Sequence, residues 1–145
     1  DVQINGKKVC GVLPEAVWQG DQLHGAVIGI GVNVRVDFHT MPPELSNIAT
    51  NVESALNHRV DRSELIASLL RYVDFWTEKL GSDELFQTWK QRLTMMGRQV
   101  VVTMPDGEKR GFVDSVLKDG QLVIIADDGT SHEILAGDVS LRVEG

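Results

Sequence analysis

Two adjacent lysines, Lys7 and Lys8, open an otherwise apolar strand pattern near the start of the chain. Because side chains alternate between the two faces of a strand, one lysine must point toward the buried side or its edge. A lysine aimed into a pocket can hold a phosphate or a carboxylate as a point charge. The alternative is a pair of solvated lysines on an edge strand, and spacing alone favours that alternative.

Other residue types that carry chemistry are sparse. Gly29 and Gly31 lie inside an apolar run rather than before a helix, so they indicate close approach by a neighbouring backbone or a ligand more than a phosphate loop. The acidic pairs at 83–84 and 127–128 stand at an expected helix start and at an expected turn, where carboxylates serve as caps and turn formers. The four histidines show no ligand spacing, and the sequence therefore predicts no metal site.

Composition narrows the class of protein further. The 145 residues are 42% hydrophobic and 24% charged, which is typical of a globular chain. Fourteen Lys and Arg against 21 Asp and Glu give a net charge of −7, the wrong sign for an unaided nucleic-acid surface. No apolar run approaches the roughly 18 residues of a membrane span. The single Cys10 forms no intrachain disulfide, and we expect a cytoplasmic setting without nucleic acid or membrane.

The first sixty residues predict strands and a long loop. Val2 and Ile4 alternate with polar residues ahead of Asn5-Gly6, a strong hairpin turn signal. The apolar run at 26–34 predicts a strand buried on both faces. The segment from Arg35 to Thr50 has no periodicity and contains two prolines, so we expect a long loop, and long loops in compact domains are often functional. A short helix is expected at 49–56.

Helices and then strands follow. Asp61 with Glu64 predicts the start of a helix that ends at Gly81, and Ser82 begins a second helix. After Gly97 the period becomes alternating, and five short strands joined by tight turns predict a small closed barrel. The expected class is α+β, with a mixed or antiparallel sheet and helices in residues 1–96 and a barrel in 97–145.

Two stretches contain distinctive motifs, Lys8-x-x-Gly11-Val12-Leu13 and Ile28-Gly29-Ile30-Gly31-Val32-Asn33. They resemble the catalytic domain of bacterial biotin-protein ligases (biotin-acetyl-CoA-carboxylase ligases). The family's Lys-x-x-Gly-Ile-Leu-x-Glu hairpin and its later Ile-Gly-x-Gly-Ile-Asn strand are similar to this sequence at the matching separation. Residues 97–145 resemble the family's SH3-like C-terminal domain. The residues that carry these resemblances are Asp1-x-x-Ile4-Asn5-Gly6-Lys7-Lys8-Val9-Cys10-Gly11-Val12-Leu13-Pro14-Glu15, Ile28-Gly29-Ile30-Gly31-Val32-Asn33-Val34, Asp119-Gly120-Gln121-Leu122 and Ala136-Gly137-Asp138-Val139-Ser140-Leu141-Arg142.

The resemblance implies a class II synthetase-like ligase fold and a two-step reaction. ATP and biotin give biotinyl-5'-adenylate, with Mg²⁺ accompanying ATP, and biotin then passes to a lysine of a biotin carboxyl-carrier domain of acetyl-CoA carboxylase or a related carboxylase. By resemblance, Lys8 is the catalytic lysine that reaches the biotin carboxylate and the adenylate phosphate, while Lys7 points away. Gly11, Gly29 and Gly31 would line the biotin slot.

The resemblance assigns two further positions. Asn33 would reach the nucleotide or fix the following loop, and Asp1 matches the last residue of the family's Lys-Trp-Pro-Asn-Asp segment. The family's Gly- and Arg-rich loop has no counterpart in this sequence. We therefore expect a piece of a longer ligase that is inactive alone.

The loop from Arg35 to Asn47 is expected to close over the adenylate as a lid, since the equivalent region of the family orders when the intermediate binds. Packing of its apolar residues onto neighbouring helices is the alternative. Two other functions stay open: a non-enzymic protein-binding module, and a lipoate-protein ligase-like transferase. Homodimerisation stays open as well.

Overall fold

The computed structural model describes residues 1–105, 107–135 and 138–141, with the backbone alone at His39 and 138–141. It separates into two compact units, Asp1–Tyr72 and Val73–Gly145. The barrel motif residues Ala136, Gly137 and Arg142 lie outside the described part of the chain.

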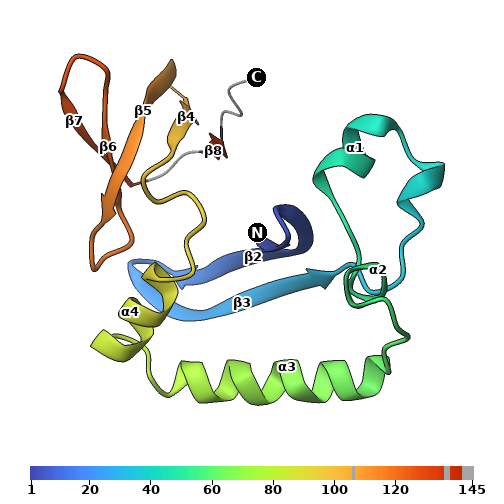
Figure 1. Ribbon diagram of the computed structural model, residues 1–145. Helices are drawn as coiled ribbons and strands as arrows, with labels where there is room; N and C mark the ends of the chain where they lie inside the picture. The colour runs from blue at the N-terminus through green and yellow to red at the C-terminus, as the bar shows by residue number, and fades with distance from the viewer. Residues whose placement is uncertain (106, 136–137, 142–145) are drawn as a thin grey trace. The chain divides into compact units, whose positions relative to one another are not determined.

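The first unit is built on a three-stranded antiparallel sheet of order β1-β2-β3. Its strands are β1 (Val2–Ile4), β2 (Lys7–Gln19) and β3 (Gln22–Val32). The predicted turn is confirmed, because Asn5 and Gly6 both have positive φ, at 51° and 76°, as a tight hairpin requires. In Figure 1, β2 and β3 run side by side as a long hairpin.

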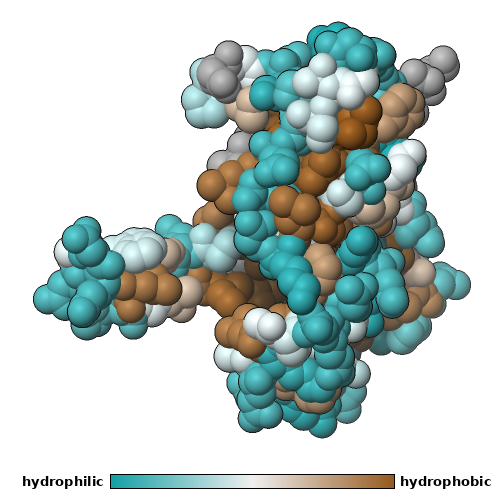
Figure 2. Space-filling view, turned by 90° about the vertical axis from the view of Figure 1, so that its left-hand side faces the viewer, coloured by the Kyte–Doolittle hydropathy of each residue, from teal (hydrophilic) through white to brown (hydrophobic). Residues whose placement is uncertain are grey.

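One expectation for this sheet is wrong. The run at 26–34 does form most of β3, but Val27 and Ile28 are 57% and 51% exposed rather than buried. An apolar β-branched run specifies a strand, whereas burial needs a second layer of side chains packed over it. Figure 2 shows one face of the molecule, on which hydrophobic residues reach the surface among hydrophilic ones.

The segment after β3 contains more helix than expected. A 3-10 turn, η1 (Phe38–Thr40), precedes α1 (Pro43–Ile48), and α2 (Val52–Leu56) falls within the predicted short helix. The two prolines do not exclude a helix here, because Pro43 occupies its first turn, where the missing N–H would be unpaired anyway. The expected loop from Arg35 to Thr50 therefore contains two short helical elements, and we call this segment the arm.

The remaining helices confirm the predicted periodicity. The third helix, α3, spans Arg62–Thr77, and α4 spans Asp83–Lys90 with the Ser82 side chain accepting from the Leu85 N–H as its N-cap. The change of period near Gly97 also holds, because every later element described is a strand.

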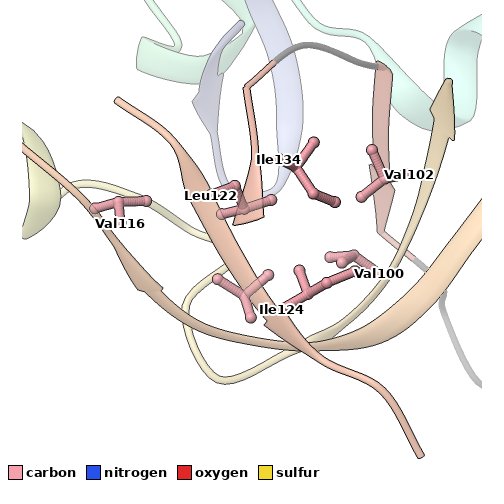
Figure 3. Packing of buried hydrophobic residues seen from close by; sticks show 7 residues of the cluster. Val100, Val102, Val116, Leu122, Ile124 and Ile134 are labelled. Carbon is pink, nitrogen blue, oxygen red and sulfur yellow. The ribbon is translucent and has the colours of Figure 1, made fainter. Parts of the chain in front are cut away.

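Five antiparallel strands follow in the order β7-β6-β5-β4-β8. Their core brings together side chains from four strands, and Figure 3 shows this cluster from close by. Within the residues described, β7 and β8 form the two edges of this sheet. The strands are β4 (Gln99–Met104), β5 (Gly107–Val116), β6 (Leu122–Ile125), β7 (Ser131–Ile134) and β8 (Asp138–Leu141). The α+β class with antiparallel sheets is confirmed.

Candidate active site

A β-bulge in β2 decides which side chains share a face near Lys8. Val2 pairs with Cys10 while Gln3 pairs with Lys8, so Val9 is an extra residue in β2. A bulge of this kind shifts the alternation by one residue. As a result Lys8 and Gly11, three positions apart, lie on the same face, and both Val9 and Cys10 are buried on the other side.

Lys8 and Asp1 form the charged pair of this face. The Lys8 Nζ lies 2.9 Å from Asp1 Oδ1, and the two side chains are 46% and 49% exposed. Gly11 faces this pair, since a Cβ built on it would lie in ordinary van der Waals contact, 3.6 Å from Lys8 Nζ and 3.8 Å from Asp1 Oδ1. The glycine therefore leaves space around the lysine that a ligand can share.

The other two glycines extend the same open surface. Gly31 pairs directly with Gly11 across the two strands, and no atom lies within 4 Å of where its Cβ would be. Gly29, two residues earlier on the same face, pairs with Leu13, whose carbonyl oxygen lies 3.4 Å from the added Cβ position. Gly11 and Gly31 thus leave backbone uncovered by side chains beside Lys8, and we call Asp1, Lys8, Gly11 and Gly31 the lysine face.

Asn33 lies at the end of β3 and joins it to the segment before α2. Its Nδ2 donates to the Thr50 carbonyl at 3.3 Å, and its own carbonyl accepts from the Val52 N–H at 2.8 Å. These contacts tie Asn33 to the residues directly before α2 and at its start.

Lys7 points to the opposite side of β2 from Lys8. Its Nζ donates to the Ser46 carbonyl at 2.9 Å, and it lines a pocket of about 650 Å³ that the sequence reasoning did not find. This pocket lies between the start of β2 and the segment from Arg35 to Arg59. No sequence motif marks the pocket, since its lining comes from Lys7 and from irregularly spaced positions between Arg35 and Arg59.

An ion pair in the wall of this pocket, between Arg35 and Glu53, causes a large pKa shift. Arg35 donates from both Nε and Nη2 to the Glu53 carboxylate at 2.7 and 2.6 Å, and the Val60 N–H adds a third bond at 3.1 Å. The Arg35 hydrogen bonds, followed by that of Val60, lower the pKa of Glu53 from 4.5 to about 2. The carboxylate thus links the segment after β3, the helix α2 and the residues before α3.

Asn51 completes this polar framework from a buried position. It is 7% exposed, and its Nδ2 donates to the Val36 carbonyl and to Ser54 Oγ, both at 2.8 Å. Its Oδ1 accepts from the Ser54 N–H as the N-cap of α2. Because a buried amide is stable only when its hydrogen bonds are satisfied, these contacts tie the Val36 carbonyl to the first turn of α2.

The described residues contain no cluster of three or more His, Cys, Asp or Glu side chains able to hold a metal ion. None of the helices in the described part of the chain is long and apolar enough to cross a membrane. The lysine face offers one cation, one carboxylate and glycines that leave the backbone uncovered. Such an arrangement can bind an anionic group and offset negative charge that develops near Lys8 Nζ.

Comparisons with known proteins point to one class, the biotin protein ligases. The chain is 29% identical to the bifunctional ligase/repressor BirA of Bacillus subtilis over 97% of its length, and 25% identical to a biotin--[acetyl-CoA-carboxylase] ligase of Paracoccus denitrificans over 86%. It spans 44% and 53% of those two proteins, about half of their length. No family model matches the chain.

Solved structures give the same result. The biotin protein ligase of Aquifex aeolicus in complex with biotin and ATP aligns with a TM-score of 0.78 and 28% identity, covering 99% of this chain and 60% of that one. A second structure of the Aquifex aeolicus enzyme aligns with a TM-score of 0.80 and 26% identity. The resemblance to biotin-protein ligases is confirmed over nearly the whole chain.

Proposed function

We propose that this chain forms part of a biotin-protein ligase active site, with Lys8 as the catalytic cation. In the first step a carboxylate oxygen of biotin attacks the α-phosphorus of ATP, pyrophosphate leaves, and biotinyl-5'-adenylate forms. In the second step the amine of a carrier lysine attacks the biotin carbonyl, AMP leaves, and an amide is formed. Negative charge on the carboxylate and phosphate oxygens is present throughout the first step.

The geometry of the lysine face supports this role. Lys8 Nζ lies beside Gly11 and its side chain is half exposed, so an anionic ligand can exchange for part of its contact with Asp1. A fixed cation of this kind accelerates reactions with developing charge by about 10²- to 10³-fold. We assign Gly11, Gly29 and Gly31 to the biotin slot, Asp1 to holding Lys8, and Asn33 to fixing the segment beside the nucleotide.

The observation that carries the proposal is that the residues expected to act together are neighbours in a chain that is similar to biotin ligases. The lysine, the paired glycines and Asp1 lie together in three dimensions, and the chain is similar throughout to proteins named as biotin ligases.

A titration by calorimetry tests the proposal. We expect the chain to bind biotinyl-adenylate more tightly than biotin, and lipoate not at all, and we expect Lys8→Ala to weaken adenylate binding while Lys7→Ala leaves its equilibrium affinity within about tenfold. Preference for lipoate would indicate a lipoate-protein ligase-like transferase. Absence of binding to all three compounds would favour a non-enzymic protein-binding module, for which the exposed apolar side chains of the β2–β3 hairpin are a suitable surface.

Several further assignments follow from the same proposal. Mg²⁺ would accompany ATP, the acceptor would be the biotin carboxyl-carrier domain of acetyl-CoA carboxylase or a related carboxylase, and the reaction would take place in the cytoplasm. Residues 1–96 would contribute the catalytic portion and 97–145 the SH3-like domain. Homodimerisation is compatible with these assignments, and neither nucleic acid nor membrane is a partner in them.

A further inference from the structure

The helix α1 has little to hold it in place. It has six residues, none of them buried, and its apolar side chains Leu45 and Ile48 are 45% and 62% exposed. An isolated helix of this length is not stable in water, because too few hydrogen bonds repay the cost of nucleation. Contacts from outside the helix must therefore stabilise it.

Lys7 supplies one such contact. The last carbonyls of a helix have no partner within it and carry the negative end of its dipole, so a cation there is stabilising. The last turn of α1 contains no basic residue of its own. Instead the ammonium of Lys7, which belongs to β2, donates to the Ser46 carbonyl at 2.9 Å. Among the described residues this is the one side-chain hydrogen bond that joins α1 to the sheet.

The neighbouring lysine is bound to the same segment through its backbone. The Lys8 carbonyl accepts from the Thr50 N–H at 2.8 Å, and Lys8 pairs with Ala49 in a parallel bridge. Ala49 in turn donates to Leu45 as the C-cap contact of α1. Two consecutive residues of β2 therefore contact this segment: Lys7 through its side chain and Lys8 through its backbone. A movement of α1 is thereby linked to the position of Lys8.

We propose that Lys7 is a positioning residue that latches α1 against β2 and thereby sets how often the arm from Arg35 to Thr50 opens. The consequence of this inference rests on the proposed function. If the chain binds biotinyl-adenylate beside Lys8, opening of the arm would set the rate at which this intermediate is released. Lys7 does not touch the reacting atoms in this proposal. It acts through α1.

Amide hydrogen exchange tests the latch in the 145-residue chain without any ligand. We expect Lys7→Met, which keeps the apolar stem but removes the donor, to speed exchange of the Leu45, Ser46 and Ala49 amides by about three- to tenfold. Lys7→Arg keeps a donor and should stay within about twofold of the wild type. Lys8→Met is the matched control and should leave these amides unchanged.

Equal exchange in all four proteins would overturn the latch, and so would an equal acceleration in the Lys8→Met control. Neither result requires the protein to bind biotin. Thermal unfolding of each variant separates local opening from a general loss of stability, since a latch changes α1 without moving the transition of the whole chain.

The dissociation rate of biotinyl-adenylate tests the consequence. We expect Lys7→Met to speed release by the same three- to tenfold with little change in the association rate, and Lys7→Arg to restore the slower rate. Binding with unchanged release in Lys7→Met would overturn the control of release by the arm, whereas the exchange result decides whether the latch exists. Absence of binding to the wild-type chain, and to any longer protein that the same gene encodes, would overturn the proposed function while the exchange result still stands.

Discussion

At the scale of single residues, the two adjacent lysines have different partners: Lys7 donates to the α1 backbone, and Lys8 pairs with the Asp1 carboxylate. Alternation predicted that the two ammonium groups point to opposite sides, and their partners do lie on opposite sides: Ser46 for Lys7 and Asp1 for Lys8. What alternation could not predict is which lysine shares a face with Gly11, because that depends on the bulge at Val9.

This division predicts different kinetic effects for the two lysines. In the protein expressed with any residues encoded before Asp1, Lys8→Ala should slow adenylate formation by about 10²- to 10³-fold because it removes the cation beside the reacting oxygens. Lys7→Ala should slow that step by less than about tenfold. Single-turnover pyrophosphate release measures the step, and similar losses in both variants would refute the assignment.

Glu53 gives a prediction about pH. Its folded-state pKa, about 2, lies below the ordinary value of 4.5, so ionised Glu53 stabilises the folded chain above about pH 4.5, and this contribution is lost as the pH falls toward 2. Glu53→Gln should therefore be less stable than the wild type at pH 7, and the difference should narrow between pH 4.5 and pH 2. Urea unfolding at a series of pH values measures it, with Glu15→Gln as an exposed control. A constant difference would show that the ion pair with Arg35 does not contribute.

At the scale of elements, local patterns predicted the hairpin, the helices α3 and α4, and the change to strands near Gly97. These features depend on turn residues, caps and periodicity, all of which are local. The burial of β3, the arm after it and the pocket beside Lys7 could not be predicted in the same way. They depend on contacts between residues far apart in sequence, such as Arg35 with Glu53 and Lys7 with Ser46.

Gly111 in β5 gives a prediction about the second sheet. A Cβ at this position would lie 2.7 Å from the Ile125 carbonyl carbon, closer than packed atoms tolerate, so β5 and β6 would have to separate. Gly111→Ala should cost about 1 to 3 kcal/mol of unfolding free energy. Gly25→Ala, whose added Cβ meets nothing within 4 Å, is the control and should stay within about 0.5 kcal/mol. Chemical denaturation measures both, and equal stabilities would contradict the close approach.

At the scale of the whole molecule, the two units have different sources of stability. The second unit has a contiguous apolar core in which Val100, Val102 and Ile124 are fully buried. In the first unit, Val9, Cys10 and Asn51 are the buried residues within the described part of the chain, and much of its order comes from polar contacts. We infer that the first unit is the less stable of the two.

The 145-residue chain should bind biotinyl-adenylate weakly and should not synthesise it. Phosphoryl transfer needs several fixed charges around the α-phosphate, and the lysine face as described offers one cation that is half exposed to water. A pyrophosphate assay with biotin and ATP measures synthesis, with the Lys8→Ala chain as the blank. Biotin-dependent release above that blank would show that the described residues suffice for the reaction.

The bulge at Val9 also has a consequence for the two lysines: with or without it, one of them shares the face of Gly11. If β2 straightened into a regular ladder, Lys7 would share the face of Gly11 and Lys8 would turn away, so a lysine occupies that face in either register. Loss of Lys8 can then be repaired without restoring a lysine at position 8. Genetic selection for suppressors of Lys8→Ala should return changes at Val9 or Cys10 that abolish the bulge and restore regular alternation along β2. Such changes would turn Lys7 toward Gly11 and would break its contact with α1.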